Sequence, residues 1–226
     1  MKSYGQFCPL ALASEIVGER WTPLILRELM LGARRFNDIH RGVPRMSPSL
    51  LSQRLQTLRK AGVIERAVVD GHAEYHPTAA GEELLPVIAS LAHWGKRWLP
   101  ATLSDENADP DLIVWDMHRR MDLARVPERR TVIEIEFCDQ PASRQRRWLV
   151  GNRSGMEMCI KDPGYEVDLL VRTDSRTITL VWYGDLPLRR AIEQGAIRLY
   201  GPPSLCRDFP SWLQLSAIAG VPRQRS

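Results

Sequence analysis

The chain has 226 residues, of which 44% are hydrophobic and 26% charged, and its formal net charge is +4. These values are typical of a soluble globular protein with one large or two ordinary domains. No apolar run reaches the roughly 18 residues that a membrane-spanning helix needs, so we expect no membrane partner. The N-terminal apolar run is interrupted by Glu15, which argues against a secretory signal and favours a cytoplasmic protein.

The positive charge is concentrated in the first part of the chain. Residues 1–100 carry 13 Lys and Arg against 9 Asp and Glu, whereas the remaining residues carry 18 of each kind. Within 34–60 there are seven basic residues and one acid, Asp38. Such an excess fits a polyanion partner such as DNA, but a solvated helix face would show the same charges.

The periodicity of the first hundred residues predicts a winged helix-turn-helix. We expect helices at 8–17, 21–30, 35–40 and 47–60, strands at 63–69 and 73–76, and a last helix at 79–99. The second helix has an apolar stripe formed by Trp21, Leu24, Ile25 and Leu29. An Asp70-Gly71 pair between the two strands is a hairpin turn pattern, and Thr78 is expected to cap the last helix.

The 47–60 helix is the candidate recognition helix. Ser47 is placed as its N-cap, Pro48 as its first residue, and Gly62 just beyond its end. Leucines at 51, 55 and 58 share one face, which leaves serine, glutamine and arginine side chains to meet base edges in a major groove. The alternative is a plain amphipathic surface helix. The candidate DNA-binding residues are Arg35, Arg41, Arg45, Ser47, Ser49, Ser52, Gln53, Arg54, Gln56 and His72.

Residues 8–100 resemble the HxlR family of bacterial winged helix-turn-helix regulators. The matching runs are Cys8-Pro9, Gly18-Glu-Arg-Trp21-Thr22, Leu24-Ile-Leu-Arg-Glu-Leu29, Gly32-Ala-Arg-Arg-Phe36-Asn-Asp-Ile39, Ser47-Pro-Ser-Leu-Leu-Ser-Gln-Arg-Leu55, Leu58, Gly62-Val-Ile, Glu65-Arg66, Tyr75-His-Pro-Thr78 and Leu91-Ala-His-Trp94-Gly95. This sequence departs from the family at Val17, where a small residue is usual, and in its short wing around 70–73.

The resemblance implies a homodimer that represses transcription from double-stranded DNA. Two recognition helices would enter successive major grooves of a two-fold operator, about 34–36 Å apart. Family dimer contacts come from the first and last helices, here around 10–16 and 84–98.

The four cysteines, Cys8, Cys138, Cys159 and Cys206, are widely spaced and form no C-x-x-C pair. This spacing excludes a zinc ribbon and favours free thiols in a reducing compartment. Several HxlR proteins sense oxidants through a cysteine at the position of Cys8, and a helix N-terminus favours the reactive thiolate. The alternative is a small apolar residue at the dimer interface. Any disulfide of Cys8 would need the partner subunit.

A polar, acidic stretch at 104–111, closed by Pro110, is predicted to be an inter-domain linker. The predicted domains are therefore 1–103 for DNA binding and dimerisation and 112–226 for a second function.

The second domain is predicted to be an α+β layer with a mainly antiparallel sheet. We expect a helix at 112–123, strands at 131–137, 147–150, 156–160, 167–172 and 177–183, a helix at 187–194, a strand at 197–200, and a closing helix at 204–219 interrupted at Pro210. Alternation along 132–137 predicts that Glu134 and Glu136 face solvent.

Residues 108–220 resemble the sterol-carrier-protein fold, including versions attached to HxlR regulators. The similarity rests on Trp148-Leu-Val, Asp162-Pro-Gly164, Val167-Asp168-Leu, Val181-Trp-Tyr-Gly184, Leu188-x-x-Ala191-Ile192, Gly195-x-Ile197-x-Leu-x-Gly201 and Phe209-x-x-Trp212-Leu. The fold implies an apolar tunnel for lipid-like molecules. Candidate residues for binding a small apolar ligand are Trp115, Trp148, Met156, Met158, Trp182, Leu205 and Trp212. The alternative for each is an ordinary core residue.

Catalytic motifs are missing from the sequence. It has no glycine-rich phosphate loop and no Ser/His/Asp spacing of a known hydrolase, so we predict no enzyme, no cofactor and no catalytic residue. His72 and His76 stand four apart, but on a wing this spacing does not form a helical metal site, and we predict no metal. Two classes remain: a regulator modulated by a ligand or by oxidation, or a lipid-binding or catalytic C-terminal domain that carries an accessory DNA-binding module.

Overall fold

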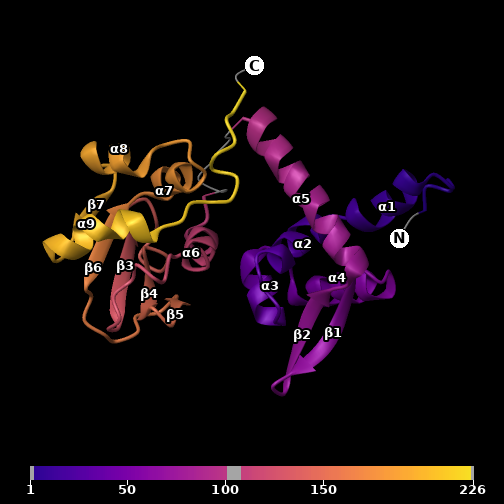
Figure 1. Cartoon of the computed structure of the whole chain (residues 1–226), viewed down its shortest axis with the longest axis horizontal. Coiled ribbons are helices and arrows are strands. Elements are labelled where there is room, and N and C mark those ends of the chain that lie inside the picture. Colours follow the sequence, from indigo (N-terminus) through magenta and orange to yellow (C-terminus); the bar gives the residue numbers. More distant parts are fainter. Residues whose placement is uncertain (1–2, 101–107, 225–226) are drawn as a thin grey trace. The chain divides into compact units, whose positions relative to one another are not determined.

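The computed structural model describes residues 3–100 and 108–224 and divides the chain into two compact units (Figure 1). Unit 1 extends to Gly95 and unit 2 begins at Lys96, so the division falls within a single helix. None of the described helices is both long and apolar enough to cross a membrane.

Unit 1 has the predicted order of helices and hairpin. Its elements are α1 (Pro9–Val17), α2 (Thr22–Met30), α3 (Phe36–Gly42), α4 (Pro48–Lys60), β1 (Ile64–Val69), β2 (His72–Pro77) and α5 (Ala79–Trp98), of which α5 continues into unit 2. Its core combines α2, α3, α4 and the start of β1. The second helix differs from prediction in one detail, because Leu24 is exposed and Leu26 takes its place in the core.

Local residue chemistry explains the boundaries of these elements. The Ser47 hydroxyl accepts a hydrogen bond from the backbone N–H of Leu50 at 3.3 Å, which caps α4. Gly62, with φ of +71°, takes the left-handed conformation that ends the helix. Asp70 and Gly71 also have positive φ, as a two-residue hairpin turn of type I′ requires. The predicted cap, stop and turn are therefore confirmed.

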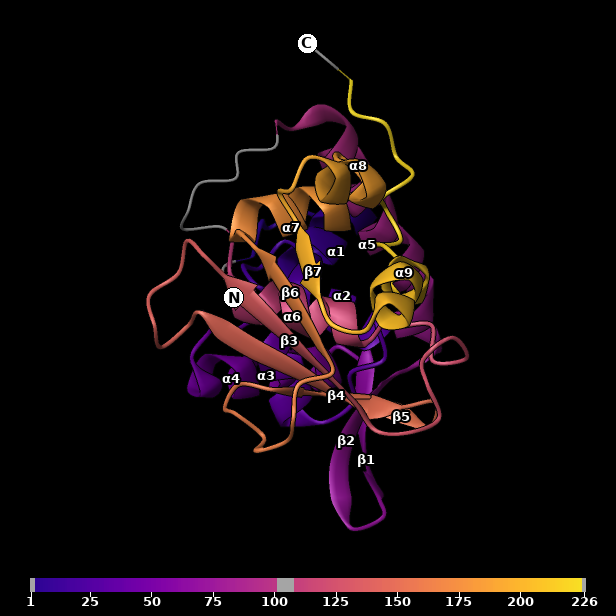
Figure 2. The same cartoon turned by 90° about the vertical axis from the view of Figure 1, so that its left-hand side faces the viewer.

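Unit 2 is a mixed α+β unit built around five strands. Its elements are α6 (Pro110–His118), β3 (Thr131–Phe137), β4 (Arg146–Asn152), β5 (Gly155–Cys159), β6 (Leu169–Thr173), α7 (Ser175–Trp182), α8 (Leu188–Glu193), β7 (Arg198–Tyr200) and α9 (Pro203–Trp212). The strand order is β5-β4-β3-β6-β7, and only β3 and β6 pair in parallel (Figure 2). The expected mainly antiparallel sheet is therefore present. Its apolar face packs against residues of α6, α7 and α9.

The segment predicted as a strand at 177–183 is the helix α7, so that prediction is wrong. The β-branched residues Thr177, Ile178, Thr179 and Val181 favour a strand in isolation. Two features of the fold override this preference. Asp174 caps the helix by accepting a hydrogen bond from the Thr177 N–H at 2.7 Å, and Ile178 and Val181 are buried in the core.

Two helix predictions around the proposed linker and the C-terminus also change. Residues 101–107 lie outside the described residues, whereas Asp109 caps α6 and Pro110 begins it, so the end of the predicted linker is helical. This helix ends at His118 rather than at Leu123. The closing helix likewise ends at Trp212 although Pro210 lies within it, and it does not reach Ala219.

The prediction that Glu134 and Glu136 face solvent is wrong. Both are only 8–9% exposed, because arginines of the neighbouring strands lie over them. Arg146 of β4 pairs with Glu134 at 3.3 Å, and Arg172 of β6 pairs with Glu136 at 3.4 Å. The alternation in β3 therefore separates an apolar core face from a face of paired charges.

Candidate nucleic-acid interface

Polar contacts from α2 and α3 hold the turn between α3 and α4 in place. Arg27 of α2 donates to the carbonyl oxygen of Gly42 at 2.9 Å and pairs with the fully buried Glu28 at 2.6 Å. A Cβ on Gly42 would lie 1.9 Å from the Glu28 carboxyl carbon, so a larger residue here would force the fully buried Glu28 side chain to move. A ring nitrogen of His40 also contacts the Met46 carbonyl oxygen at 2.7 Å. Together these contacts fix the approach of α3 to α4.

The recognition helix α4 turns one face inward and one outward. Leu51, Leu55 and Leu58 are at most 1% exposed and seat the helix in the core. The side chains predicted to meet DNA at Ser47, Ser49, Ser52, Gln53 and Gln56 belong to exposed residues. Ser47 and Ser49 hydroxyls lie 3.2 Å apart at the first turn. The outer face is thus a continuous strip of hydroxyl and amide groups.

Arg54 does not share this outer face. Its guanidinium donates to Glu19 at 2.6 Å, and its side chain is only 16% exposed. Glu19 lies in the loop between α1 and α2, so the pair joins this loop to the recognition helix. The structure therefore separates Arg54 from the exposed Gln53, although the sequence had placed both among the base-reading candidates.

Three predicted arginines surround the recognition helix at different places. Arg45, in the turn before α4, is exposed, and Arg41, on α3, is exposed and lies 3.7 Å from Asp38. Arg35 lies where α3 meets the wing, 3.6 Å from Glu74 of β2. The side chains of Arg35 and Arg41 are 50% and 53% exposed, so both guanidinium groups are accessible to a backbone phosphate.

The wing contributes His72, which is exposed at the start of β2 next to the turn. The structure also shows a basic recess that the sequence analysis did not single out. A hollow of about 500 Å³ at the end of α4 has three basic lining residues, Arg59, Lys60 and Arg66, and one acidic one, Glu65; Gln56 and Ile64 complete its lining. The alternation of β1 could not have found Arg66, because it lies two residues after the buried Ile64 and therefore on the same face of the strand, although it is exposed.

Unit 1 also exposes a second surface, which is apolar. On α5, Val87, Leu91 and Trp94 recur at spacings of four and three and are each more than half exposed. On α1, Leu10 and Leu12 are exposed at 74% and 51%. An apolar stripe of this kind on a helix is an unfavourable surface in water unless another protein covers it.

Cys8 is the N-cap residue of α1 and is an exposed free thiol. Its backbone carbonyl accepts a hydrogen bond from the Leu12 N–H at 3.1 Å. No group of three or more histidine, cysteine or acidic side chains that could hold a metal occurs among the described residues.

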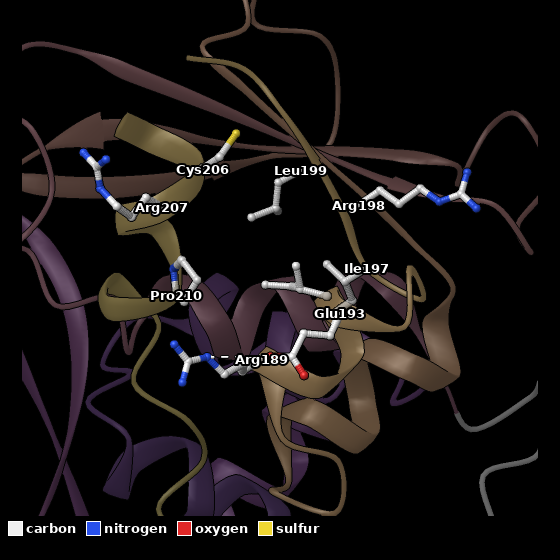
Figure 3. Close-up of a pocket in the computed structure, with 9 residues that line it drawn as sticks. Arg189, Glu193, Ile197, Arg198, Leu199, Cys206, Arg207 and Pro210 are labelled. Carbon is white, nitrogen blue, oxygen red and sulfur yellow. Dashed lines mark ion pairs between the residues drawn. The ribbon is translucent and has the colours of Figure 1, made fainter. Parts of the chain in front are cut away.

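The apolar residues predicted to bind a ligand in unit 2 are mostly parts of its core. Trp182 and Trp212 are at most 2% exposed inside the main cluster, Trp115, Trp148 and Leu205 are 6–7% exposed, and Met156 and Met158 pack at its edge. A cavity of about 620 Å³ lies elsewhere, between α8, β7 and α9, and none of these seven residues lines it (Figure 3).

Comparison with known proteins extends the description of unit 1. Residues 16–103 match the HxlR-like helix-turn-helix family. An uncharacterized HTH-type transcriptional regulator of Mycobacterium tuberculosis is 40% identical over 116 residues, which cover 45% of this chain and 72% of that protein. The uncharacterized HTH-type transcriptional regulator YvaP of Bacillus subtilis is 32% identical over 104 residues, which cover 44% of this chain and 96% of its own.

Among solved structures, the stereoselective inverting sec-alkylsulfatase Pisa1 from Pseudomonas sp. has 18% sequence identity and a TM-score of 0.41, covering 51% of this chain and 18% of its own. These values are too low to support an inference about activity. The resemblance of unit 2 to the sterol-carrier-protein fold stays a prediction.

Proposed function

Because this chain belongs to the HxlR-like helix-turn-helix family of DNA-binding transcriptional regulators, we propose that it acts as a homodimeric repressor on a two-fold operator. The observation that carries the proposal is the outer face of α4. Its serine and glutamine side chains are exposed on a helix whose N-terminus is capped and whose leucines are buried. A helix held in this way can present a fixed set of hydrogen-bonding groups to base edges.

Charged residues around α4 supply the sequence-independent part of binding. Arg35, Arg41, Arg45 and the recess of Arg59, Lys60 and Arg66 border the helix on its turn and wing sides. Guanidinium and ammonium groups bind backbone phosphates and so orient the helix in the groove. We assign base readout to Ser49, Gln53 and Gln56, and phosphate contact to these basic residues.

The apolar surface of α1 and α5 supports the dimer. Covering Val87, Leu91 and Trp94 with the same helix of a second subunit would remove them from water, and a two-fold axis would then relate the two recognition helices. We expect the chain to sediment as a dimer. Leu91→Asp should shift it to a monomer, whereas Val68→Asp, at an exposed aliphatic position on the wing, should not. A monomeric wild type would contradict the dimer.

Operator binding tests the assignment of α4. Full-length protein is used to select a duplex from a random-sequence library, and affinity is then measured at fixed salt concentration. Gln53→Ala should weaken binding by about 1–3 kcal/mol, or roughly 5- to 150-fold, if it reads a base. Gln194→Ala, at an exposed glutamine after α8 in unit 2, should leave affinity unchanged. Failure to enrich any sequence would overturn the proposed function.

We further propose that the regulator responds to oxidation at Cys8 or to an apolar ligand in unit 2. Cys8 is exposed at a helix N-terminus, which supports reaction with an oxidant, and the cavity in unit 2 supports a ligand. Hydrogen peroxide should lower operator affinity of the wild type but not of Cys8→Ser. Equal loss in both proteins would remove Cys8 from this role. A ligand acts on DNA binding only if it prefers one conformational state.

A further inference from the structure

The last turn of α5 has little in its own sequence to stabilise it. Gly95 lies inside the helix at the end of unit 1, and glycine is among the least favourable residues in a helix interior. Trp98 is followed by Leu99 and Pro100, so no glycine ends the helix with backbone hydrogen bonds. The carbonyl groups of this turn therefore need partners from elsewhere in the chain.

The C-terminal end of the described chain supplies these partners where it passes the end of α5 (Figure 1). The Arg223 guanidinium donates hydrogen bonds to the carbonyl oxygens of Lys96 at 3.1 Å and Leu99 at 2.8 Å. The Gln224 backbone N–H donates to the carbonyl oxygen of Arg97 at 2.8 Å. A segment far along the chain thus satisfies the carbonyl groups at the end of the helix.

An ion-pair cluster joins the same segment to the connection between α7 and α8. Asp185 in this connection pairs with Lys96, whose side chain is only 3% exposed. Arg223 also binds Asp185, with its Nε at 3.0 and 3.1 Å from the two carboxylate oxygens and its Nη2 at 3.0 Å from one of them. Because a buried ammonium group without a counter-charge is strongly unfavourable, Lys96 keeps the end of α5 next to Asp185 and Arg223.

The C-terminal segment is itself fixed to the core of unit 2. The Ser216 backbone N–H donates to the carbonyl oxygen of Trp182 at 3.1 Å, and Trp182 is a core residue only 2% exposed. A Cβ on Gly184 would lie 2.5 Å from the carbonyl oxygen of Ala219, so the two backbones are in close contact. The hydrogen bonds of Arg223 therefore connect the end of α5 to the packed interior of unit 2.

We propose that residues 221–224 form a strap that orders the last turn of α5 when unit 2 is folded, and that this order controls the dimer contact of α5. The proposal rests on the proposed homodimer, in which Val87, Leu91 and Trp94 meet a second subunit. In an α-helix each amide bonds to the carbonyl four residues earlier, so the Trp98 amide bonds to Trp94. Because helix formation is cooperative, fraying at Trp98 loosens Trp94. The strap thus makes operator binding depend on unit 2.

Peptide-resolved hydrogen exchange on full-length Arg223→Gln protein tests the strap without DNA. Amides of residues 96–99 should exchange about threefold faster than in wild type, or more, because the last turn loses its carbonyl partners. Amides of β3 should be unchanged, which shows that unit 2 still folds. Arg223→Lys should give an intermediate rate, because one ammonium group cannot reach Asp185 and both carbonyl oxygens together. The matched control Arg190→Gln, at an exposed arginine of α8, should exchange like wild type.

Sedimentation and operator binding then test whether the strap acts on the dimer. Arg223→Gln should raise the dissociation constant of the dimer by about three- to tenfold and weaken operator binding at protein concentrations near that constant.

Two results would overturn the proposal. Unchanged exchange at residues 96–99 in Arg223→Gln would remove the strap, and faster exchange with an unchanged dimer would reduce it to a local helix cap. A monomeric wild type would refute the proposed function and with it the effect on the dimer, whereas the exchange rates would still decide whether the strap exists.

Discussion

Unit 1 and unit 2 place their candidate functional residues in different ways. In unit 1 the candidates lie on one helix and its flanks, so they are close in sequence, and Ser49, Gln53 and Gln56 are exposed as the helical period requires. In unit 2 the residues that line the cavity lie within 189–210, but they come from α8, β7, α9 and the loops between them, so the cavity forms only when three elements pack together. The predicted aromatic ligand residues of unit 2 are instead buried in its core.

This difference shows how far an exposed polar pattern and a set of buried apolar residues can each identify a functional site. A polar strip opposite buried leucines is typical of any amphipathic surface helix, so it indicates a DNA-binding face here only together with the basic residues and the wing on either side of α4. Tryptophan and methionine satisfy a core as well as a ligand site, so their presence decides nothing until their neighbours are known.

Removing a core leucine should give the largest effect and test whether the two units have separate cores. Leu55→Ala should lower the free energy of unfolding of unit 1 by about 2–5 kcal/mol, because it opens a cavity at a position 1% exposed. Hydrogen exchange resolved by peptide should show the loss in unit 1 and not in unit 2. Val68→Ala, at an exposed site, should cost less than about 0.5 kcal/mol. Equal loss of protection in both units would mean that they unfold together.

Gly42→Ala should be the next most damaging change in unit 1. The added methyl group would meet the buried Glu28 carboxylate at 1.9 Å and force apart the turn before the recognition helix. We expect about 1–3 kcal/mol of lost stability, measured by denaturant unfolding, together with weaker operator binding. The control is Gly220→Ala, where an added Cβ meets nothing within 4 Å. A stable Gly42→Ala protein with normal operator affinity would refute the steric role of this glycine.

Substitutions at Gln53 and Arg54, which are neighbours on α4, should distinguish an effect on DNA binding from an effect on stability. Arg54→Ala should lower the stability of unit 1 by about 1 kcal/mol, because the partly buried pair with Glu19 is lost. Gln53→Ala should leave stability unchanged and weaken DNA binding instead. Glu19→Ala combined with Arg54→Ala should cost less than the sum of the single changes, because the two act through one interaction. Additive losses would show that the pair contributes nothing of its own.

The smallest predicted effect concerns the pH dependence of unit 2. Partial burial of Asp185 opposes its ionisation, but hydrogen bonds from Arg223 and Lys96 outweigh this and hold the pKa of the carboxyl below its ordinary value of 3.8. A lowered folded-state pKa means that the stabilisation is present in full above the unfolded value and is lost as pH falls through the folded value.

We therefore expect Asp185 to contribute up to about 1 kcal/mol at pH 7, since it is only partly buried, and nothing at strongly acidic pH. Asp185→Asn should reduce the stability of unit 2 at pH 7, and the difference from wild type should shrink below pH 4. Urea unfolding at a series of pH values measures this difference. A constant difference across the series would show that the ionised carboxyl is not responsible.

The fold of unit 1 could be predicted almost completely from short-range patterns. Ser47, Pro48 and Gly62 mark the ends of α4, and Asp70-Gly71 fixes the hairpin turn, because each acts on backbone within a few residues of itself. At α7 two local preferences compete, because Asp174 is an N-cap residue while the β-branched run that follows it favours a strand, and the burial of Ile178 and Val181 in the core decides for the helix.

By itself, the sequence determined the winged helix-turn-helix, the buried leucines of α4 and the polar strip opposite them, since helical periodicity and capping depend on residues close together in the chain. Only the tertiary structure decided that Arg54 pairs with Glu19, that Glu134 and Glu136 are buried beneath arginines, and that unit 2 has a cavity beside Arg189 and Arg207. Each of these depends on which elements become neighbours, because charge pairing and enclosed volume are properties of contacts between elements and not of any one element.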